Sequence, residues 1–320
     1  MGVRKILVVR NDRFGEFLLN IPAMRALKRA HPFAQLALAA DPYLRGLAGC
    51  IDVVDEVIPW ENRRHTFAEI IRFAREIKKN RFDLCVIFNP TRDFHLVSFL
   101  AGIQSRVGYN RKWGFLLTRT LNDEKYLGLK HEVEYNLELA ALAGGLEGIP
   151  PLSLTIDERV IARMAVCFSQ AKDLISVHPF TSDPQKQWPL GHFLALIKKL
   201  SLSQKVQVAV VGGNEERDKH HDFIVSLGSN TVDMVGKTSL VELGAVLKKS
   251  ALLISADSGP VHLASCVGTR TIALFRNDLA GKGALRWGPL AKGSIVLEKS
   301  NLGNISAEEV LDKVRVILND

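Results

Sequence analysis

Short apolar runs alternate with amphipathic segments along most of the chain. Each run in the first half has five or six residues, mostly Val, Ile, Leu and Ala, which predicts buried strands. The segments between them carry apolar residues at helical spacing. Because strands and helices alternate, the pattern predicts βαβ units built on a parallel sheet. The predicted strands are 5–9, 35–40 and 83–88, and the predicted helices are 17–30, 67–80 and 131–143.

The pattern breaks at 144–155, where three glycines and two adjacent prolines indicate a linker. A second alternating series follows, so we expect an α/β fold with two Rossmann-like parallel-sheet domains, 1–150 and 151–320. The last helix has Ser306 as a predicted N-cap with Glu309 three residues later, and it can pack back on the first domain. The second series has strands at 174–178, 206–211, 251–256 and 271–275, and helices near 191–200, 215–227, 239–249 and 306–318.

Composition narrows the function classes. The chain has 320 residues, 47% of them hydrophobic, and a net charge of +8. No apolar run reaches the roughly 20 residues that span a bilayer, and charged residues end the N-terminal run too early for a signal peptide. No basic–aromatic motif indicates a nucleic-acid partner, so the charge fits an ordinary basic protein or a smaller anionic partner. The scattered cysteines predict neither disulfides nor a metal site, and hence a cytoplasmic protein: Cys50, Cys85, Cys167 and Cys266.

The segment at 254–275 carries the most informative candidate site. A strand ends at Asp257, and a Ser-Gly-Pro turn leads into a helix that carries His262. Ser258 can cap that helix, and Gly259 allows a ligand to approach the backbone. Free N–H groups and the positive helix end suit a phosphate. The same residues also fit a plain strand–turn–helix corner with a core histidine.

Two more strand-end loops in the second half carry polar groups. Gly212 and Gly213 could let a nucleotide donor lie on their turn. Glu216, which follows them, could accept ribose hydroxyls or only complement the helix dipole. In the other loop a lysine could neutralise a diphosphate leaving group, or could be an ordinary solvent-exposed side chain. That loop contains Thr181, Ser182 and Lys186.

The first half offers a carboxylate and a basic region. Glu16 follows Gly15 near a predicted helix start, where it could complement the helix dipole or act as a general base. No GxGxxG fingerprint follows the first strand, which argues against dinucleotide binding. The stretch 94–122 has no acid; its arginines and an earlier pair could hold an anionic acceptor or form a solvated face. The candidates are Arg63, Arg64, Arg106 and Arg111.

Together these segments resemble glycosyltransferase family 9, the ADP-heptose:lipopolysaccharide heptosyltransferases, along nearly the whole chain. Their order and spacing are more specific than any single motif. The segments are RNDRFGEFLLNIPAMRALKRAHP at 10–32, HEVEYNLELAALAG at 131–144, KQWP at 186–189, GKTSL at 236–240, ADSGPVHLASCVGT at 256–269 and RWGP at 286–289.

The resemblance implies a GT-B fold, in which two Rossmann-like domains face a central cleft. The second half would bind ADP-heptose, and the first would receive a Kdo-lipid A acceptor of the lipopolysaccharide inner core at the inner-membrane surface. Glu16 matches the catalytic base, and Lys186 matches the lysine near the donor diphosphate. The implied reaction is a single inverting displacement that needs no metal or cofactor, since ADP-heptose is a substrate. The other matched donor residues are Thr181, Ser182, Glu216, Thr238, Asp257, Ser258, Gly259 and His262.

Two departures from the family pattern leave alternatives open. The family's catalytic base is usually an aspartate, whereas this chain has a glutamate, Glu16, at the matching position. Where the family commonly has Gly-Pro-Thr-Asp, this chain has Arg276-Asn277-Asp278-Leu279. The acceptor and details of the donor pocket could therefore differ. The alternatives are a GT-B transferase using another nucleotide sugar or a protein acceptor, a non-catalytic nucleotide-sugar-binding protein, and a sugar-nucleotide epimerase.

Overall fold

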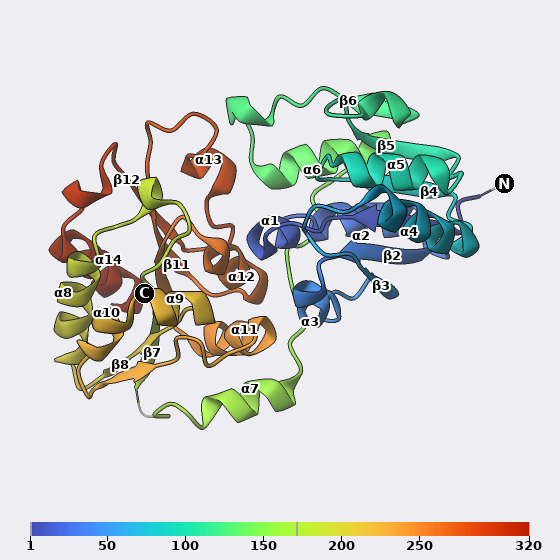
Figure 1. Ribbon diagram of the computed structural model, residues 1–320. Coiled ribbons are helices and arrows are strands. Elements are labelled where there is room, and N and C mark those ends of the chain that lie inside the picture. Colours follow the sequence, from blue (N-terminus) through green and yellow to red (C-terminus); the bar gives the residue numbers. More distant parts are fainter. Residues whose placement is uncertain (1, 171, 320) are drawn as a thin grey trace. The chain divides into compact units, whose positions relative to one another are not determined.

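The computed structural model describes residues 2–170 and 172–319, and the chain divides into two compact units, Met1–Leu152 and Ser153–Asp320 (Figure 1). The linker pattern placed this boundary at 150/151. Each unit is built on a six-stranded sheet in which every strand pairs in parallel with its neighbours. The prediction of an α/β chain with two Rossmann-like parallel-sheet domains is confirmed.

The first unit has its strands in the order β3-β2-β1-β4-β5-β6. Helices α4 and α5 pack together, as do α2 and α6. Neighbouring strands β1 and β4 mark the point where the chain reverses its direction of travel across the sheet, which is where doubly wound folds place ligands. The elements are β1 Lys5–Val9, α1 Phe14–Leu18, α2 Ile21–Ala30, β2 Gln35–Ala40, α3 Arg45–Ala48, β3 Glu56–Pro59, α4 Phe67–Asn80, β4 Leu84–Ile87, α5 Arg92–Leu100, β5 Ser105–Tyr109, β6 Arg119–Leu121 and α6 Glu132–Leu142.

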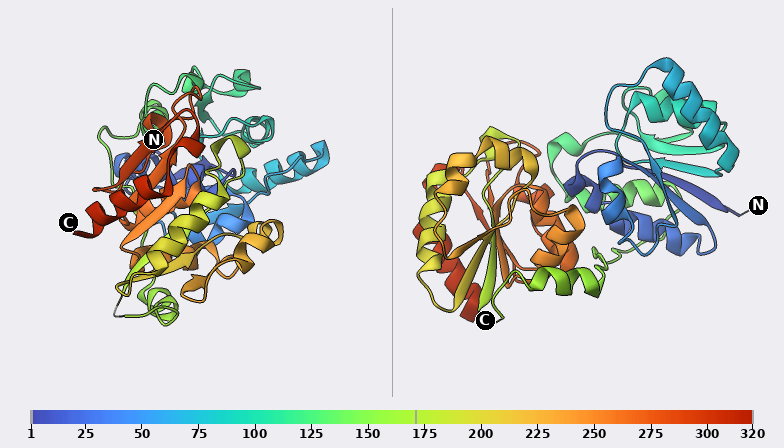
Figure 2. Two further views of the ribbon diagram at one scale, coloured as in Figure 1. Left: turned by 90° about the vertical axis from the view of Figure 1, so that its left-hand side faces the viewer. Right: turned by 60° about the horizontal axis from the view of Figure 1, so that its bottom comes forward.

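The second unit repeats the same topology, with the order β12-β11-β10-β7-β8-β9 and the reversal between β7 and β10. Helices α8 and α14 lie together on one face of this sheet, and α11 and α12 lie on the other (Figure 2). The elements are α7 Glu158–Ala165, β7 Asp173–His178, α8 Leu190–Ser201, β8 Val206–Val210, α9 Asn214–Lys219, α10 His221–Val225, β9 Thr231–Asp233, α11 Leu240–Lys249, β10 Leu252–Ala256, α12 Gly259–Val267, β11 Thr271–Phe275, α13 Ala284–Trp287, β12 Ile295–Glu298 and α14 Ala307–Asn319.

Two predicted helices are each divided in the structure. The segment expected as one helix over 17–30 forms α1 and α2, because Pro22 lacks an N–H and its ring disfavours a helical turn before it. The segment expected over 215–227 forms α9 and α10. His220 lies between them outside the helical region, at φ −120°, and its ring stacks on Phe180 with centroids 4.9 Å apart.

The strands that the pattern did not predict are the outer ones of each sheet, together with β5. They are short, and β3, β6, β9 and β12 have no fully buried residue, so they lack the continuous apolar run that marks a central strand. An edge strand buries less of its surface and tolerates polar residues on it.

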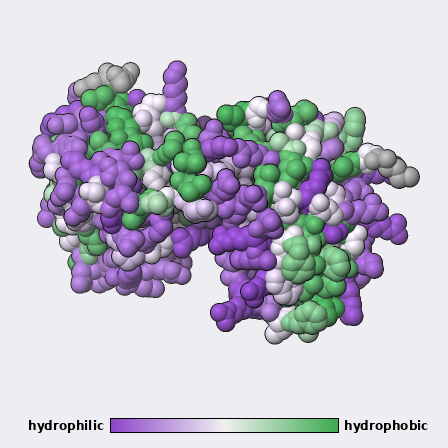
Figure 3. All heavy atoms as spheres, turned by 90° about the horizontal axis from the view of Figure 1, so that it is seen from above, coloured by the Kyte–Doolittle hydropathy of each residue, from purple (hydrophilic) through white to green (hydrophobic). Residues whose placement is uncertain are grey.

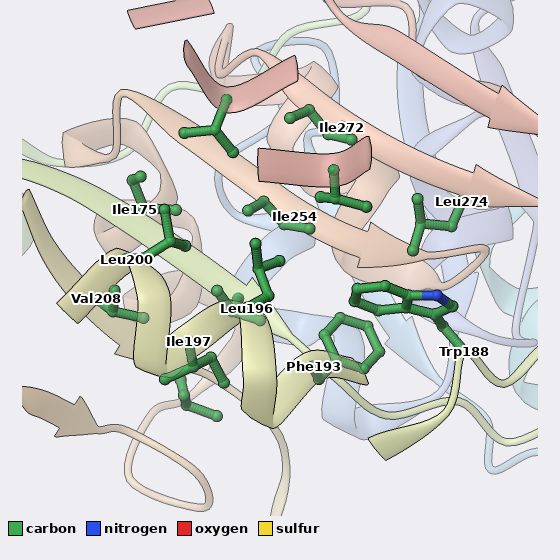
Figure 4. Close-up of a cluster of buried hydrophobic side chains, with 14 of the residues drawn as sticks. Ile175, Trp188, Phe193, Leu196, Ile197, Leu200, Val208, Ile254, Ile272 and Leu274 are labelled. Carbon is green, nitrogen blue, oxygen red and sulfur yellow. The ribbon is translucent and has the colours of Figure 1, made fainter. Parts of the chain in front are cut away.

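Figure 4 shows part of the core of the second unit, and the C-terminal helix also contributes to this core. Trp188 and Phe193 pack edge to face beside β10 and β11, with ring centroids 4.5 Å apart. The Trp188 indole is fully buried and donates Nε1–H to the carbonyl of Ile305 at 2.9 Å. Helix α14 contributes its apolar stripe to this same core and contacts α8 and β11. That stripe is Val310, Val314 and Ile317.

Among the residues that the structure describes, no helix combines the length and the apolar character needed to cross a bilayer. On the face drawn in Figure 3, hydrophilic side chains cover much of the surface and apolar ones gather in patches between them.

Candidate functional site

In the first unit, a buried arginine collects the carboxylates that follow β1. Arg10 comes directly after the strand and is 3% exposed. Its Nε donates to Asp12 Oδ1 at 2.7 Å, and its Nη2 donates to Glu16 Oε2 at 3.0 Å. The side chain of Glu16 keeps a third of its surface exposed. The carboxylate is thus held in one orientation while it stays accessible.

A second set of charges supports the arginine from α6. Arg10 Nη1 lies 3.9 Å from Glu132 Oε1, and that carboxylate pairs with Lys125 Nζ at 2.6 Å. Lys125 also donates to Asn136, whose amide in turn donates to the carbonyl of Leu19. Arg10 and Lys125 therefore link three carboxylates, Asp12, Glu16 and Glu132, in one cluster of charges.

The pKa values of the two carboxylates nearest Arg10 are shifted in opposite directions. Burial raises the pKa of Asp12 and outweighs the pull of Arg10. Burial also opposes ionisation of Glu16, but Arg10 and a hydrogen bond with Asp12 outweigh it, so the pKa of Glu16 lies below its usual value. Of the two carboxylates, Glu16 is therefore the one that ionises more readily.

In the second unit, the ends of β7 and β10 bring a lysine to an aspartate. Lys186 lies in a short 3₁₀ turn after β7, and Asp257 follows β10. Lys186 Nζ is 2.5 Å from Asp257 Oδ2, and both side chains are largely buried. Burial raises the pKa of Asp257, and the charge of Lys186 opposes that rise. The structure thus brings two of the predicted donor residues together.

Beside this pair, Ser258 begins α12 but does not cap it with its side chain. Its Oγ lies 2.8 Å from Ser255 Oγ and 3.2 Å from His178 Nδ1. The register of β7 and β10 pairs Ser255 directly with His178, so this contact follows from the sheet itself. Gly259 and the buried His262 continue the helix, and the His262 ring lies 6.1 Å from Trp287.

The glycines after β8 have packing roles in the structure. A Cβ on Gly212 would lie 2.8 Å from the Phe180 ring, so the close approach here is to a side chain of the protein. Glu216 Oε2 accepts from the N–H of Gly213 at 2.8 Å, so this acid caps the start of its own helix, a role that adds to the helix-dipole alternative. A contact of Glu216 with ribose stays a prediction, as does one of the half-buried Thr238 with adenine.

The loop that carries Lys186 is tied to the segment where the chain departs from the family pattern. Arg276 pairs with Asp278 at 2.6 Å and donates to the carbonyl of Gln185 at 3.3 Å. Lys282, three residues after that segment, lies 3.2 Å from Asp183 and adds a second tie to the loop. Within that loop, Thr181 Oγ1 accepts from the N–H of Asp183, and Ser182 is exposed.

The predicted acceptor arginines differ in their availability. Arg63 pairs with Glu61 and Glu69, and Arg111 pairs with Asp123 at 3.0 Å. The guanidinium of Arg106 donates to the carbonyls of Leu116 and Ile103, so it braces the loop after β5. Arg64 is exposed. Acceptor binding by Arg63, Arg64, Arg106 and Arg111 stays a prediction.

Sequence reasoning missed the residues that orient the candidates. Arg10, Asp12, His178 and Ser255 are each explained by their partners in space rather than by a motif. A signal was present for Arg10 and His178, since a charged or titratable residue directly at the end of a buried strand is costly unless it is paired.

Comparison with known proteins identifies the family. Residues 70–314 match the model of "Glycosyltransferase family 9 (heptosyltransferase)". Lipopolysaccharide heptosyltransferase 2 of Salmonella typhimurium is 23% identical over 85% of this chain and 82% of its own length. Lipopolysaccharide heptosyltransferase 1 of the same organism is 24% identical over 97% and 99%.

Solved structures agree on the fold. E. coli ADP-heptose LPS heptosyltransferase II has a TM-score of 0.87 at 21% identity, with 98% of each chain covered. E. coli heptosyltransferase WaaC, solved with ADP, has a TM-score of 0.76 at 19% identity, with 98% of this chain and 99% of that chain covered. The GT-B fold class expected from the resemblance is confirmed. Because the family model matches residues 70–314, which is well over half of the chain, this chain belongs to glycosyltransferase family 9.

Proposed function

We propose that the chain transfers a heptose from ADP-heptose to an inner-core lipopolysaccharide acceptor of the Kdo-lipid A type, with inversion and without a metal or cofactor. The observation that carries the proposal is the Lys186–Asp257 pair beside the uncapped start of α12, at the β7/β10 reversal. A cation and a positive helix end are suited to a diphosphate leaving group. The names of the family relatives support heptose as the sugar and lipopolysaccharide as the acceptor class.

The proposed reaction is a single displacement. The acceptor hydroxyl gives its proton to the Glu16 carboxylate as its oxygen bonds to the anomeric carbon of the heptose. The bond from that carbon to the β-phosphate oxygen breaks, and ADP leaves with the electron pair. Attack opposite the leaving group inverts the anomeric centre. Glu16 is suited to this role because Arg10 keeps it ionised and oriented.

The donor half supplies charge and contacts. Lys186 is proposed to move from Asp257 to the departing phosphate. The diphosphate carries two negative charges and therefore attracts the ammonium group more strongly than one carboxylate does. Thr181 and Ser182 are placed to contact the sugar and phosphates, Glu216 the ribose, and Thr238 the adenine. No step requires a metal ion, since the lysine and the backbone amides of α12 offset the developing charge.

The proposed acceptor is anionic and is anchored in a membrane, and the first unit has a surface suited to that setting. We call it the aromatic–basic strip: Phe99, Arg106, Lys112, Trp113 and Phe115. Arg106 lies over the Phe99 ring at 5.6 Å, and the Trp113 and Phe115 centroids are 6.4 Å apart. Phe115 is 78% exposed. Exposed aromatic rings next to cations suit the headgroup region of an anionic bilayer.

Two experiments test these proposals. The first measures ADP release with ADP-heptose and either a Kdo-lipid A acceptor or a protein acceptor, with and without a chelator. We expect turnover only with the glycolipid and no loss on chelation. ADP release with another nucleotide sugar or with protein would favour the corresponding alternative, and donor binding without any turnover would indicate a non-catalytic binding protein.

The second experiment measures sedimentation with phosphatidylglycerol vesicles and with phosphatidylcholine vesicles. We expect binding to the anionic vesicles only, and its loss in the variant Phe115→Ser. Phe33→Ser is the matched control, because Phe33 is also an exposed phenylalanine but lies outside the strip. Equal loss in both variants would refute a role for the strip.

A further inference from the structure

The hydroxyl of Ser258 belongs to a hydrogen-bonded group that the proposed reaction does not use. Ser258 stands at the N-cap position of α12, where a serine normally accepts from a backbone N–H of the first turn. Here the side chain makes no such bond, and its Oγ lies against Ser255 and His178 instead. His178 is 6% exposed, and Ser255 is fully buried.

The hydrogens in this group can be assigned by counting them. Ser255 has one hydroxyl hydrogen, and it donates that hydrogen to the carbonyl of Ala256 at 2.8 Å. The 2.8 Å contact between the two hydroxyls therefore uses the hydrogen of Ser258. His178 Nδ1 lies 3.2 Å from Ser258 Oγ and 3.3 Å from Ser255 Oγ, and neither hydroxyl has a hydrogen left for it. The assignment that satisfies all four contacts therefore makes the Nδ1 atom the donor.

We infer that His178 is a positioning residue: as the neutral Nδ1–H tautomer it holds the Ser258 hydroxyl away from the start of α12, so that the backbone amides there remain available to the phosphates of the donor. This inference rests on the proposed donor role of α12. A serine that capped its own helix would compete with the donor phosphates for the same backbone N–H groups. His178 would prevent this competition by holding the hydroxyl elsewhere.

The surroundings of the imidazole agree with a single ring hydrogen. Burial lowers the pKa of His178 to about 4, so the ring is neutral near pH 7. The register of β7 and β10 places the ring against Ser255, and the Phe180 ring packs on it edge to face at 5.9 Å. The ring therefore has little freedom to exchange its partners.

The test is a double-mutant cycle on ADP affinity, measured by calorimetry with the full chain. In His178→Leu the Ser258 hydroxyl is released and can cap α12, so we expect ADP to bind about fivefold more weakly, the size of an N-cap hydrogen bond. In the Ser258→Ala background no hydroxyl can cap the helix. Adding His178→Leu there should weaken ADP binding by less than about twofold, which is within the error of additivity. His178→Asn, whose amide can donate in place of Nδ1–H, should bind like the wild type.

The outcomes separate this inference from the proposed function. Equal losses from His178→Leu in both backgrounds would show a packing role only and overturn the inference. If the wild type fails to bind ADP, the proposed function fails. The tautomer can still be read directly from the imidazole ¹⁵N resonances of the unmodified protein, and an Nε2–H ring would also overturn the inference. That measurement applies even if His178→Leu does not fold.

Discussion

Replacing Glu16 with glutamine removes the proposed base while leaving its surroundings nearly intact. Arg10 keeps its 2.7 Å bond to Asp12, and Glu16 is one-third exposed, so the unfolding free energy should fall by no more than about 1 kcal/mol. A general base contributes about 10²–10⁴-fold in rate. We therefore expect kcat to fall at least about a hundredfold, on the scale of that contribution.

The residual rate should depend on Asp12. The negative charge of Glu16 raises the pKa of Asp12, so the glutamine variant lets Asp12 ionise more readily and act in its place. Asp12→Asn alone should keep most of the activity, whereas adding it to Glu16→Gln should lower kcat further. Glu16→Asp should retain part of the rate, because the shorter side chain keeps a carboxylate near Arg10.

The assay is steady-state ADP release with saturating donor, with thermal melting as the control for folding. Donor affinity is measured separately by calorimetry and should not change, because the predicted donor contacts belong to the second unit. If the glutamine variant turns over at a near-normal rate, Glu16 is not the base. Its carboxylate then serves only the charge cluster around Arg10.

Three further outcomes are expected. Gly212→Ala should destabilise the fold by about 1–3 kcal/mol, the usual cost of overpacking, because its Cβ would meet the Phe180 ring at 2.8 Å; a denaturant titration measures this. Lys186→Met should raise the donor KM and lower kcat together, whereas Lys186→Arg should recover part of both; equal kinetics in all three proteins would exclude Lys186 from the donor site. Because the pKa of His178 is lowered to about 4, its neutral form stabilises the fold fully above pH 6.5, and that contribution is lost as pH falls toward 4. Unfolding free energies at pH 7 and pH 5 should differ by up to about 2 kcal/mol more in the wild type than in His178→Asn, and an unchanged difference would contradict this reasoning.

The sequence predicted the central strands and the long helices because each carries its own signal. Strands β1, β2 and β11 have the predicted bounds, since a fully buried strand reads as one apolar run. The outer strands were missed because their place is decided by a neighbour in space. Helix α1 shows the same limit, since only the proline after it indicates a break and nothing in its own five residues marks its start.

The site was predictable in part for the same reason. The Ser-Gly-Pro turn is a local motif, so Asp257 and Ser258 could be singled out from the sequence. The support that Arg10 receives from Glu132, by contrast, comes from a residue more than a hundred positions away along the chain. The protonation of Asp12 depends on burial and on several charges at once, which no single segment encodes.

The bond from Trp188 to Ile305 has a practical consequence for protein engineering. Trp188 follows Lys186 by two residues, and its indole hydrogen bonds to the carbonyl that precedes α14 by two residues. The 3₁₀ turn that carries the lysine is thus anchored to the C-terminal segment rather than only to its sequence neighbours. A truncation that removes Ile305 and α14 would release this anchor as well as part of the core. We would therefore expect such a shortened protein to lose donor affinity even where it still folds, and a purification tag is better placed at the other end of the chain.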